Sequence, residues 1–258
     1  MRHIFLATLI PIFIGACSGG NTAGNDGNNT NQGANISPGP LLELDANNSV
    51  VLANQFCANR NILQVLSTSL LSAYSVKDNG SDLNYCGGSI DLDEQGLNFD
   101  INISDYCVNA RGQQLTLNGD ITGTTESGAN FTSTINTLAI VGSTTNLSVD
   151  GTTWDGRADD MFISLNVFDH AKEEQLYIDN VSIKKGELDF GYITFSGMDA
   201  TEFKFIDYFN TELTQGQVFF YGTNDEILIL SADNGAITAV LKQSKTDSGT
   251  LLNTNCDS

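Results

Sequence analysis

Residues 97–104 read LNFDINIS, and this stretch decides the fold. Apolar side chains at Leu97, Phe99, Ile101 and Ile103 alternate with polar side chains at the positions between them. In an extended chain, a period of two places the apolar side chains on one face and the polar side chains on the other. An antiparallel strand with one buried face and one face in water has this pattern. The stretch therefore predicts a sheet that buries one of its faces.

The same alternation returns in the segments that follow. Turns rich in Gly, Asn and Asp separate these segments at intervals of roughly 10 to 15 residues, which is typical of a meander of consecutive hairpins. The positions that we expect to face the core are Leu115, Leu117, Ile121, Phe131, Ile135, Ala139, Val141, Met161, Ile163, Leu165 and Val167.

Between Phe190 and Phe220 the alternation disappears. Apolar residues occupy both faces of the segments 187–197 and 201–210, and residues 225–233 are almost continuously apolar. Strands of this kind are buried on two sides or line a cavity. The aromatic residues here therefore form a candidate apolar groove for a lipid or another apolar ligand, and ordinary core packing is the alternative. The groove residues would be Phe190, Tyr192, Phe195, Phe203, Phe205 and Phe209.

Ahead of the strands, residues 49–76 carry apolar side chains at helical spacing, with Asn48 or Ser49 as the expected N-cap. The polar run 59–61 weakens the middle, so one helix and two helices are both compatible with the pattern. Together these features predict a single α+β domain over residues 41–258. In it, a long N-terminal helix packs on a large, twisted antiparallel sheet of about ten to twelve strands. A β-sandwich or barrel with the helix as a lid is the alternative.

The first sixteen residues have the features of a secretory signal peptide. Arg2 supplies a positive start, and residues 4–14 are apolar apart from Thr8 and Pro11. This run is far shorter than the roughly 20 apolar residues that a membrane-spanning helix needs. Gly15 and Ala16 are the small residues expected before a cleavage site. We therefore expect residues 1–16 to be removed.

The sequence Ile14-Gly15-Ala16-Cys17 resembles the lipobox of bacterial lipoproteins. The resemblance implies that Cys17 becomes the new N-terminus and carries acyl chains such as palmitate, which anchor the protein in a lipid bilayer. Ser18, rather than Asp, follows the cysteine, which in this class implies the outer membrane of a Gram-negative cell. Residues 17–40 would then form an acylated, flexible tether, because a stretch so poor in large apolar residues cannot offset the entropy of ordering. The stretch 106–123 also resembles uncharacterised β-rich lipoproteins of Gram-negative bacteria, and it implies no residue role.

The cysteine count fits this interpretation. The chain has five cysteines, and acylation of Cys17 leaves four in an oxidising compartment, enough for two disulfides. Four cysteines allow three pairings. We favour Cys86 with Cys107, which flank one predicted hairpin, and Cys57 with Cys256, which would tie the end of the chain to the helix.

The formal net charge of −20 limits the partners. Nucleic-acid binding requires a basic footprint, and electrostatic docking on anionic lipid requires one as well. The acidity is therefore interpreted as a source of solubility and self-repulsion, with salt adaptation or divalent-cation binding as alternatives.

Few patterns in the sequence indicate a catalytic site. His170, the one histidine after the predicted signal peptide, follows Asp169, but no nucleophile-elbow sequence accompanies the pair. Residues 91–96 partly match a calcium-binding loop, although a hairpin turn is the favoured interpretation. Residues 155–160 form an acidic cluster beside Trp154, which could stack on a sugar. We expect no cofactor, no metal site and no assigned catalytic residue.

The sequence therefore predicts a non-catalytic, membrane-anchored envelope lipoprotein that acts as a binding or structural module. Two alternatives remain. The first is a glycan-acting hydrolase that uses paired carboxylates among Asp155, Asp159 and Asp160. The second is a calcium-dependent adhesion or assembly protein.

Overall fold

The computed structural model describes residues 39–78, 85–110, 112–126, 130–157, 160–184, 187–209 and 213–256. The predicted signal peptide, the acylation site Cys17 and the tether up to residue 38 lie outside this part of the chain. No helix in the described ranges combines the length and the hydropathy that crossing a membrane requires.

Helix α1 runs without a break from Ala46 to Tyr74, over 29 residues, and the short 3-10 helix η1 (Ser75–Asp78) follows it. The N-cap is Asp45, not Asn48 or Ser49. Oδ1 of Asp45 accepts the backbone N–H groups of Asn47 and Asn48, both at 2.8 Å. A carboxylate in this position satisfies donors that have no partner inside the helix, so the helix begins earlier than the apolar spacing predicts.

Within the described ranges, fourteen strands form one open, antiparallel sheet. Nearly all neighbours in the sheet are also neighbours in sequence, in the order β1 to β7 and then β9 to β14, and β8 pairs with β7 beside this path. The strands are β1 (Tyr85–Gln95), β2 (Asn98–Ala110), β3 (Gln113–Thr125), β4 (Phe131–Gly142), β5 (Asn146–Arg157), β6 (Asp160–Asp169), β7 (Glu174–Lys184), β8 (Glu187–Leu188), β9 (Phe190–Phe195), β10 (Thr201–Asp207), β11 (Gln217–Tyr221), β12 (Ile227–Asp233), β13 (Ala236–Lys242) and β14 (Thr250–Leu252).

The described part of the chain is therefore mostly antiparallel sheet with one α-helix, and an α+β arrangement with a large open sheet is consistent with it. The sheet has more strands than the ten to twelve that the sequence predicts. Two of them, β8 and β14, are only 2 and 3 residues long. Strands this short show no periodicity, so a search for alternation misses them.

A register shift in β4 reverses the second half of one predicted pattern. Phe131 and Ile135 are buried as expected, but Ala139 and Val141 face away from the core, and Leu138 and Ile140 are buried instead. The pairing of β4 with β5 shifts between Ile135 and Leu138. An extra residue at such a bulge moves all later side chains to the opposite face, so a strict period of two fails beyond it.

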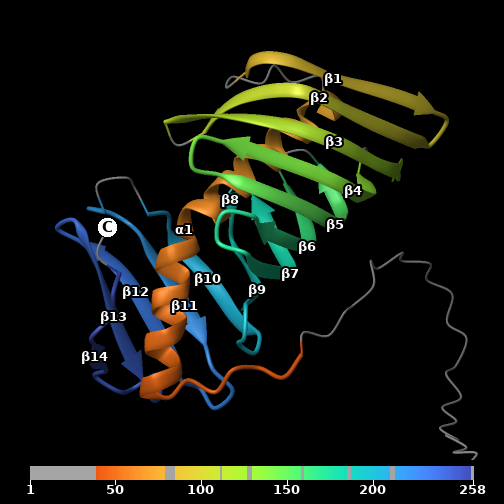
Figure 1. Ribbon diagram of the computed structural model, residues 1–258. Coiled ribbons are helices and arrows are strands. Elements are labelled where there is room, and N and C mark those ends of the chain that lie inside the picture. The colour runs from red at the N-terminus through yellow and green to blue at the C-terminus, as the bar shows by residue number, and fades with distance from the viewer. Residues whose placement is uncertain are drawn as a thin grey trace, which may run out of the picture. The chain divides into compact units, whose positions relative to one another are not determined.

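Helix α1 packs on both halves of the sheet, which we call the N-terminal half (β1–β7) and the C-terminal half (β9–β14) (Figure 1). Near its start, the ring of Phe56 lies 5.6 Å from Phe209 and 5.4 Å from Phe220, between ring centroids. At its end, Tyr74 stacks on Phe131 at 5.1 Å. One helix therefore covers the buried face of two groups of strands.

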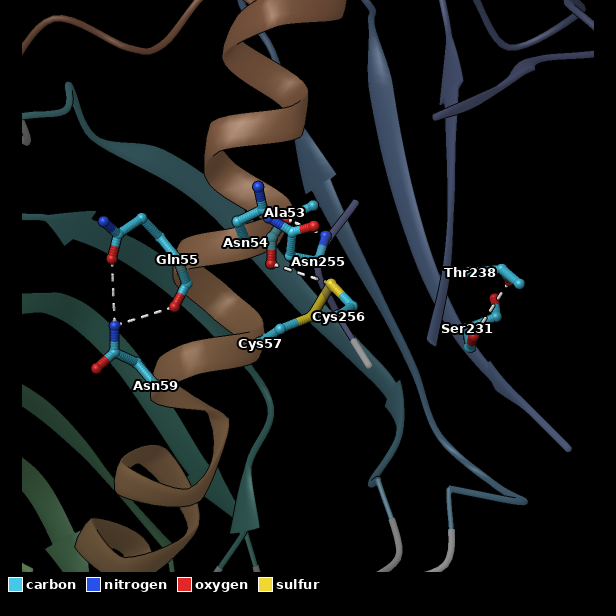
Figure 2. Close-up of a disulfide and its surroundings, with 9 residues drawn as sticks. All are labelled: Ala53, Asn54, Gln55, Cys57, Asn59, Ser231, Thr238, Asn255 and Cys256. Atoms are coloured by element: carbon cyan, nitrogen blue, oxygen red, sulfur yellow. Dashed lines mark hydrogen bonds between the residues drawn. A yellow bond between two sulfur atoms is a disulfide. The ribbon is translucent and has the colours of Figure 1, made fainter. Parts of the chain in front are cut away.

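Two disulfides fix the arrangement, and they are the two favoured pairs. Cys57 on α1 is bonded to Cys256, with 5.3 Å between their Cα atoms, and Figure 2 shows this bridge. Next to it, the backbone N–H of Asn255 donates to Oδ1 of Asn54 at 2.8 Å. The second bridge joins Cys86 on β1 to Cys107 on β2. The C-terminal segment is thus attached to the helix by a covalent bond and a hydrogen bond.

Candidate functional site: a polar cavity at the middle of helix α1

A cavity of about 430 Å³ lies beside residues 58–65 of α1. Its other walls come from the start of β3, the turn 143–145 between β4 and β5, the end of β6 with the turn after it, and Phe209 after β10. Both halves of the sheet therefore contribute to it. Its volume is within the range of small-molecule sites, roughly 300–1,000 Å³.

The helix contributes a mixed wall because the polar run 59–61 interrupts its apolar stripe. Ile62 and Val65 supply an apolar surface, while Arg60 and Asn61 supply polar groups. Gln64 holds a neighbouring wall in place, since its Nε2 donates to the backbone oxygen of Phe209 at 3.1 Å. Two residues of the polar run that suggested a helix break, Arg60 and Asn61, therefore lie in the cavity wall.

The wall opposite the helix is held by hydrogen bonds between β3 and the turn after β4. Gln113 Nε2 donates to Oγ1 of Thr145 at 3.2 Å, and Oγ1 of Thr144 donates to Oε1 of Gln113 at the same distance. The backbone N–H of Gly142 donates to the Thr145 oxygen at 2.7 Å, which closes the turn. These contacts define the position of several polar side chains before any ligand arrives.

Lys172 and Asp169 form a cation–carboxylate pair at the edge of the cavity. Nζ of Lys172 lies 3.7 Å from Oδ2 of Asp169, and it donates to the backbone oxygen of Ala58 at 2.8 Å and to Oδ1 of Asn59 at 3.0 Å. Oδ1 of Asp169 accepts the N–H of Ala171 at 2.9 Å. Lys172 therefore joins the turn after β6 to the helix, and its ammonium group already has acceptors within the protein.

Arg60 differs from Lys172, although it lines the same cavity. Its guanidinium has no ion pair and no hydrogen bond to any residue in the described ranges. Partial burial lowers the pKa of Arg60 from its ordinary value, because desolvation disfavours the charged form. The cavity thus contains a partly buried cation that no residue in the described part of the chain neutralises.

The structure places the histidine candidate outside this cavity. His170 is exposed, and its Nε2 lies 2.7 Å from Oγ of Ser148, while its ring contacts the edge of Phe168. Asp169 is directed to Lys172 and not to this histidine. The described residues therefore do not bring Asp169, His170 and Ser148 together as a triad.

The acidic candidates whose side chains the structure describes lie on β1 and β6, which are not neighbours in the sheet. Asp91 and Asp93 are exposed on β1, and Asp160 is exposed at the start of β6. The side chain of Asp155 and the whole of Asp159 lie outside the described part of the chain, and within that part no group of three metal-ligating side chains occurs. Trp154 is half-buried and stacks on Phe162, with 6.0 Å between ring centroids.

The six aromatic residues of the candidate groove do not line one groove. Phe195, Phe203, Phe205 and Phe209 are buried in the core under α1. Phe190, which is 37% exposed, and Tyr192 project from the opposite face of β9. Alternation does hold in these strands. It is hidden in the sequence because both faces carry aromatic side chains, so the core-packing alternative applies to the four buried residues.

Comparison with known proteins gives no relative: no protein-family model matches the chain, and no curated protein or solved structure matches it. The site must therefore be interpreted from its own geometry. Sequence reasoning treated the polar run of α1 only as a weak point of the helix, and of the six candidate groove residues it is Phe209 that lines this cavity. Gln113, Thr145 and Lys172 carry no motif, and only the fold brings them to Arg60.

Proposed function

We propose that the protein is a non-catalytic binding module of the bacterial envelope, anchored in the outer membrane through acylated Cys17, and that its ligand occupies the cavity beside α1. The observation that carries the binding role is the cavity itself, since its polar and apolar walls come from five separate chain segments. A site with this mixed lining suits a small molecule that needs both contact area and orientation. We also propose that the fold belongs to the α+β class, with α1 packed on both halves of the sheet.

The resemblance of residues 14–17 to a lipobox supports the anchoring. The chain after the tether is attached to the sheet, because Leu42 N–H donates to the Ala200 oxygen at 2.8 Å. A polar tether of about 20 residues has a typical span of roughly 25 Å, so the binding module would stay close to the bilayer. Two or three acyl chains supply the stable insertion that one chain does not.

The hydrogen bonding around the cavity favours binding over catalysis. Asp169, the carboxylate in the described lining, already accepts from Ala171 and pairs with Lys172. It is therefore occupied in positioning the turn after β6. Gln113 and Thr145 bond to each other in the same way. Because these side chains are hydrogen-bonded to other parts of the protein, they define the shape of the pocket, which suits ligand recognition.

The anchoring is tested with Cys17→Ser. We expect the wild-type protein to require detergent for extraction and to give an N-terminal peptide whose mass includes the acyl chains, and we expect the variant to lack both properties. An unmodified Cys17 in the wild-type protein would contradict the proposed anchor.

The binding role is tested by filling the cavity. Ala58 lines the cavity and Val51 is an exposed position on the same helix outside its lining, so Ala58→Trp and Val51→Trp form a matched pair. Native mass spectrometry of the full chain, extracted in a mild detergent, should detect a bound small molecule in the wild type and in Val51→Trp. Ala58→Trp should lose it. Equal occupancy in both variants would place the ligand elsewhere and contradict the proposal.

A further inference from the structure

We propose that the cavity beside α1 binds a small organic oxyanion, a carboxylate or a phosphate ester, and that Arg60 is the residue that pairs with the anionic group. This inference rests on the proposed binding role of the cavity and adds the chemical class of the ligand.

The first argument is the state of Arg60. The chain has 31 Asp and Glu residues against 11 Lys and Arg residues. In such an excess of acids an arginine can readily acquire a carboxylate partner. Arg60 nevertheless has no ion pair and no hydrogen bond to any described residue, although it is partly buried. Withdrawing a charge from water has a cost that a partner of opposite charge offsets, and a ligand is the partner that the cavity can admit.

The second argument is the contrast with Lys172 in the same cavity. The ammonium group of Lys172 has three donors, and it contacts three acceptors, on Ala58, Asn59 and Asp169. The guanidinium of Arg60 has five donors in a planar fork that matches the two oxygens of a carboxylate or a phosphate. The two cations therefore have different roles. Lys172 connects parts of the protein, and Arg60 is left for recognition.

The third argument is the size and lining of the cavity. At about 430 Å³ it is much larger than a bare oxyanion requires, so it has room for a larger body attached to the anionic group. Asn61, Ser143 and Thr144 offer hydrogen-bonding groups to such a body, and Ile62 and Leu147 offer apolar contact. A phosphorylated or carboxylated small molecule with polar substituents fits this combination.

The net charge of the chain sets the conditions of the test. A net charge of −20 repels anions over long distances at low ionic strength. At about 0.15 M salt the Debye length is about 8 Å, so distant acids are screened and the local contact with Arg60 decides binding. Binding is therefore measured at this ionic strength, which is kept constant with chloride as the anions are varied.

The probes share one body and differ in charge. Glucose is the neutral probe, glucuronate carries a carboxylate and glucose 6-phosphate carries a phosphate, while acetate and inorganic phosphate test the bare anions. The full mature chain in a non-ionic detergent is titrated with each, and the dissociation constant is taken from the dependence of the thermal unfolding midpoint on ligand concentration. We expect at least one anionic sugar to bind about tenfold or more tightly than glucose, and the stronger of the two identifies the anionic group.

Three variants locate the effect. Arg60→Gln should weaken the binding of the anionic sugar about tenfold or more, as the loss of charge-assisted hydrogen bonds requires. Arg60→Lys, which keeps the charge but loses the fork, should give an intermediate affinity. Lys204→Gln, which removes one positive charge from the exposed face of β10, should bind like the wild type.

Equal affinities of the wild type and Arg60→Gln for the anions would overturn the inference, and so would the lack of a saturable response to all four anions. Glucose binding as tightly as both charged sugars, and losing its affinity in Ala58→Trp, would overturn the oxyanion inference while leaving the proposed binding role intact. The failure of one proposal is thus separable from the failure of the other.

Discussion

The two ends of helix α1 are held on the sheet by different interactions. On the C-terminal half, Phe56 packs in a cluster of phenylalanine rings, and the disulfide of Cys57 lies next to it. On the N-terminal half, Tyr74 stacks on Phe131, and its hydroxyl lies 2.5 Å from Oγ of Ser133. Apolar packing and a covalent bond hold the first end, whereas an aromatic contact and buried hydrogen bonds hold the second. The middle of the helix, between these contacts, is where the cavity forms.

This difference shows how one helix can cover the buried face of a sheet and still leave room for a cavity. Apolar contacts are non-directional, so the Phe56 cluster stabilises mainly through buried area. Buried hydroxyl contacts are directional and costly to leave unmade, so those of Tyr74 specify a position. The polar run between the two consists of Asn59, which is buried, Arg60, which is half-buried, and Asn61, which is exposed. Four predictions test this comparison.

The largest effect is expected from the covalent link at the first end. Replacing Cys57 and Cys256 by serine opens a loop with a sequence separation of 199, whereas replacing Cys86 and Cys107 opens one of 21. Since the entropy of loop closure grows with loop length, the first pair of replacements should lower the free energy of unfolding by about 5 kcal/mol and the second by about 3 kcal/mol. Urea unfolding of the two double variants measures both values. A larger loss from replacing Cys86 and Cys107 would contradict the expectation that the disulfide with the longer loop stabilises the protein more.

Removal of the aromatic packing at the same end should have the next largest effect. Phe56→Ala leaves a cavity among Phe205, Phe209 and Phe220, and should lower the free energy of unfolding by about 3–5 kcal/mol. Phe56→Leu, which keeps most of the volume, is the control and should lose about 1 kcal/mol. Chemical denaturation distinguishes them. Near-equal losses in the two variants would show that packing of the ring does not hold this end.

The second end should respond to alkaline pH. Burial raises the pKa of Tyr74 to about 12, above its ordinary value of 10.0. Between these two values the unfolded chain loses this proton and the folded protein keeps it, so stability is complete below pH 10 and falls as the pH rises toward 12. Two pH units correspond to about 2–3 kcal/mol.

The measurement compares the wild type with Tyr74→Phe, which lacks the titrating group. Tyr177, Tyr192 and Tyr221 also have a raised pKa through partial burial, and they contribute equally to both proteins. The difference between the two stability profiles therefore reports Tyr74 alone. Parallel profiles from pH 9 to pH 12 would show that this hydroxyl is not buried as described.

At neutral pH, Tyr74→Phe should have the smallest effect of the four, a loss of about 1–2 kcal/mol. The variant keeps the stacking on Phe131 and loses the hydroxyl that contacts Ser133 and Thr153. Ser133 retains a partner, because its Oγ lies 2.8 Å from Oγ1 of Thr153. Adding Ser133→Ala to the variant should therefore cost about 1–2 kcal/mol more, because it breaks the remaining buried contact with Thr153. A loss above that of Phe56→Ala would mean that the hydroxyl contacts, and not the rings, dominate the packing of the helix.

Sequence reasoning was most successful where one face of a strand meets water. The alternation around Phe99 and Ile101 predicts β2 correctly, because the polar residues between them leave one face of this strand in water. On the C-terminal half, the outer face carries a row of paired apolar side chains, Phe219, Ile229, Val240 and Leu251. The alternation there could not be recognised, since both faces are apolar.

The candidate site was harder to predict for a different reason. Arg60 and Lys172 are more than a hundred positions apart, and only the docking of the helix on the turn after β6 brings both to the cavity. The sequence does flag the polar run 59–61 as an interruption of the helical stripe. It does not say whether such an interruption ends the helix or faces a cavity, because that depends on the long-range contacts of Phe56 and Tyr74.

The most direct test of the site is the NMR signal of the arginine side chains in a chain that begins at residue 17. Residues 17–258 contain Arg60, Arg111 and Arg157, and Arg60→Gln identifies the Nε–Hε resonance of Arg60. We predict that an anionic sugar, glucuronate or glucose 6-phosphate, shifts this resonance saturably and leaves the other two nearly unchanged, while glucose has no effect. An Arg60 resonance that does not move, or that moves no more than those of Arg111 and Arg157, would contradict the assignment of the cavity as an anion-binding site.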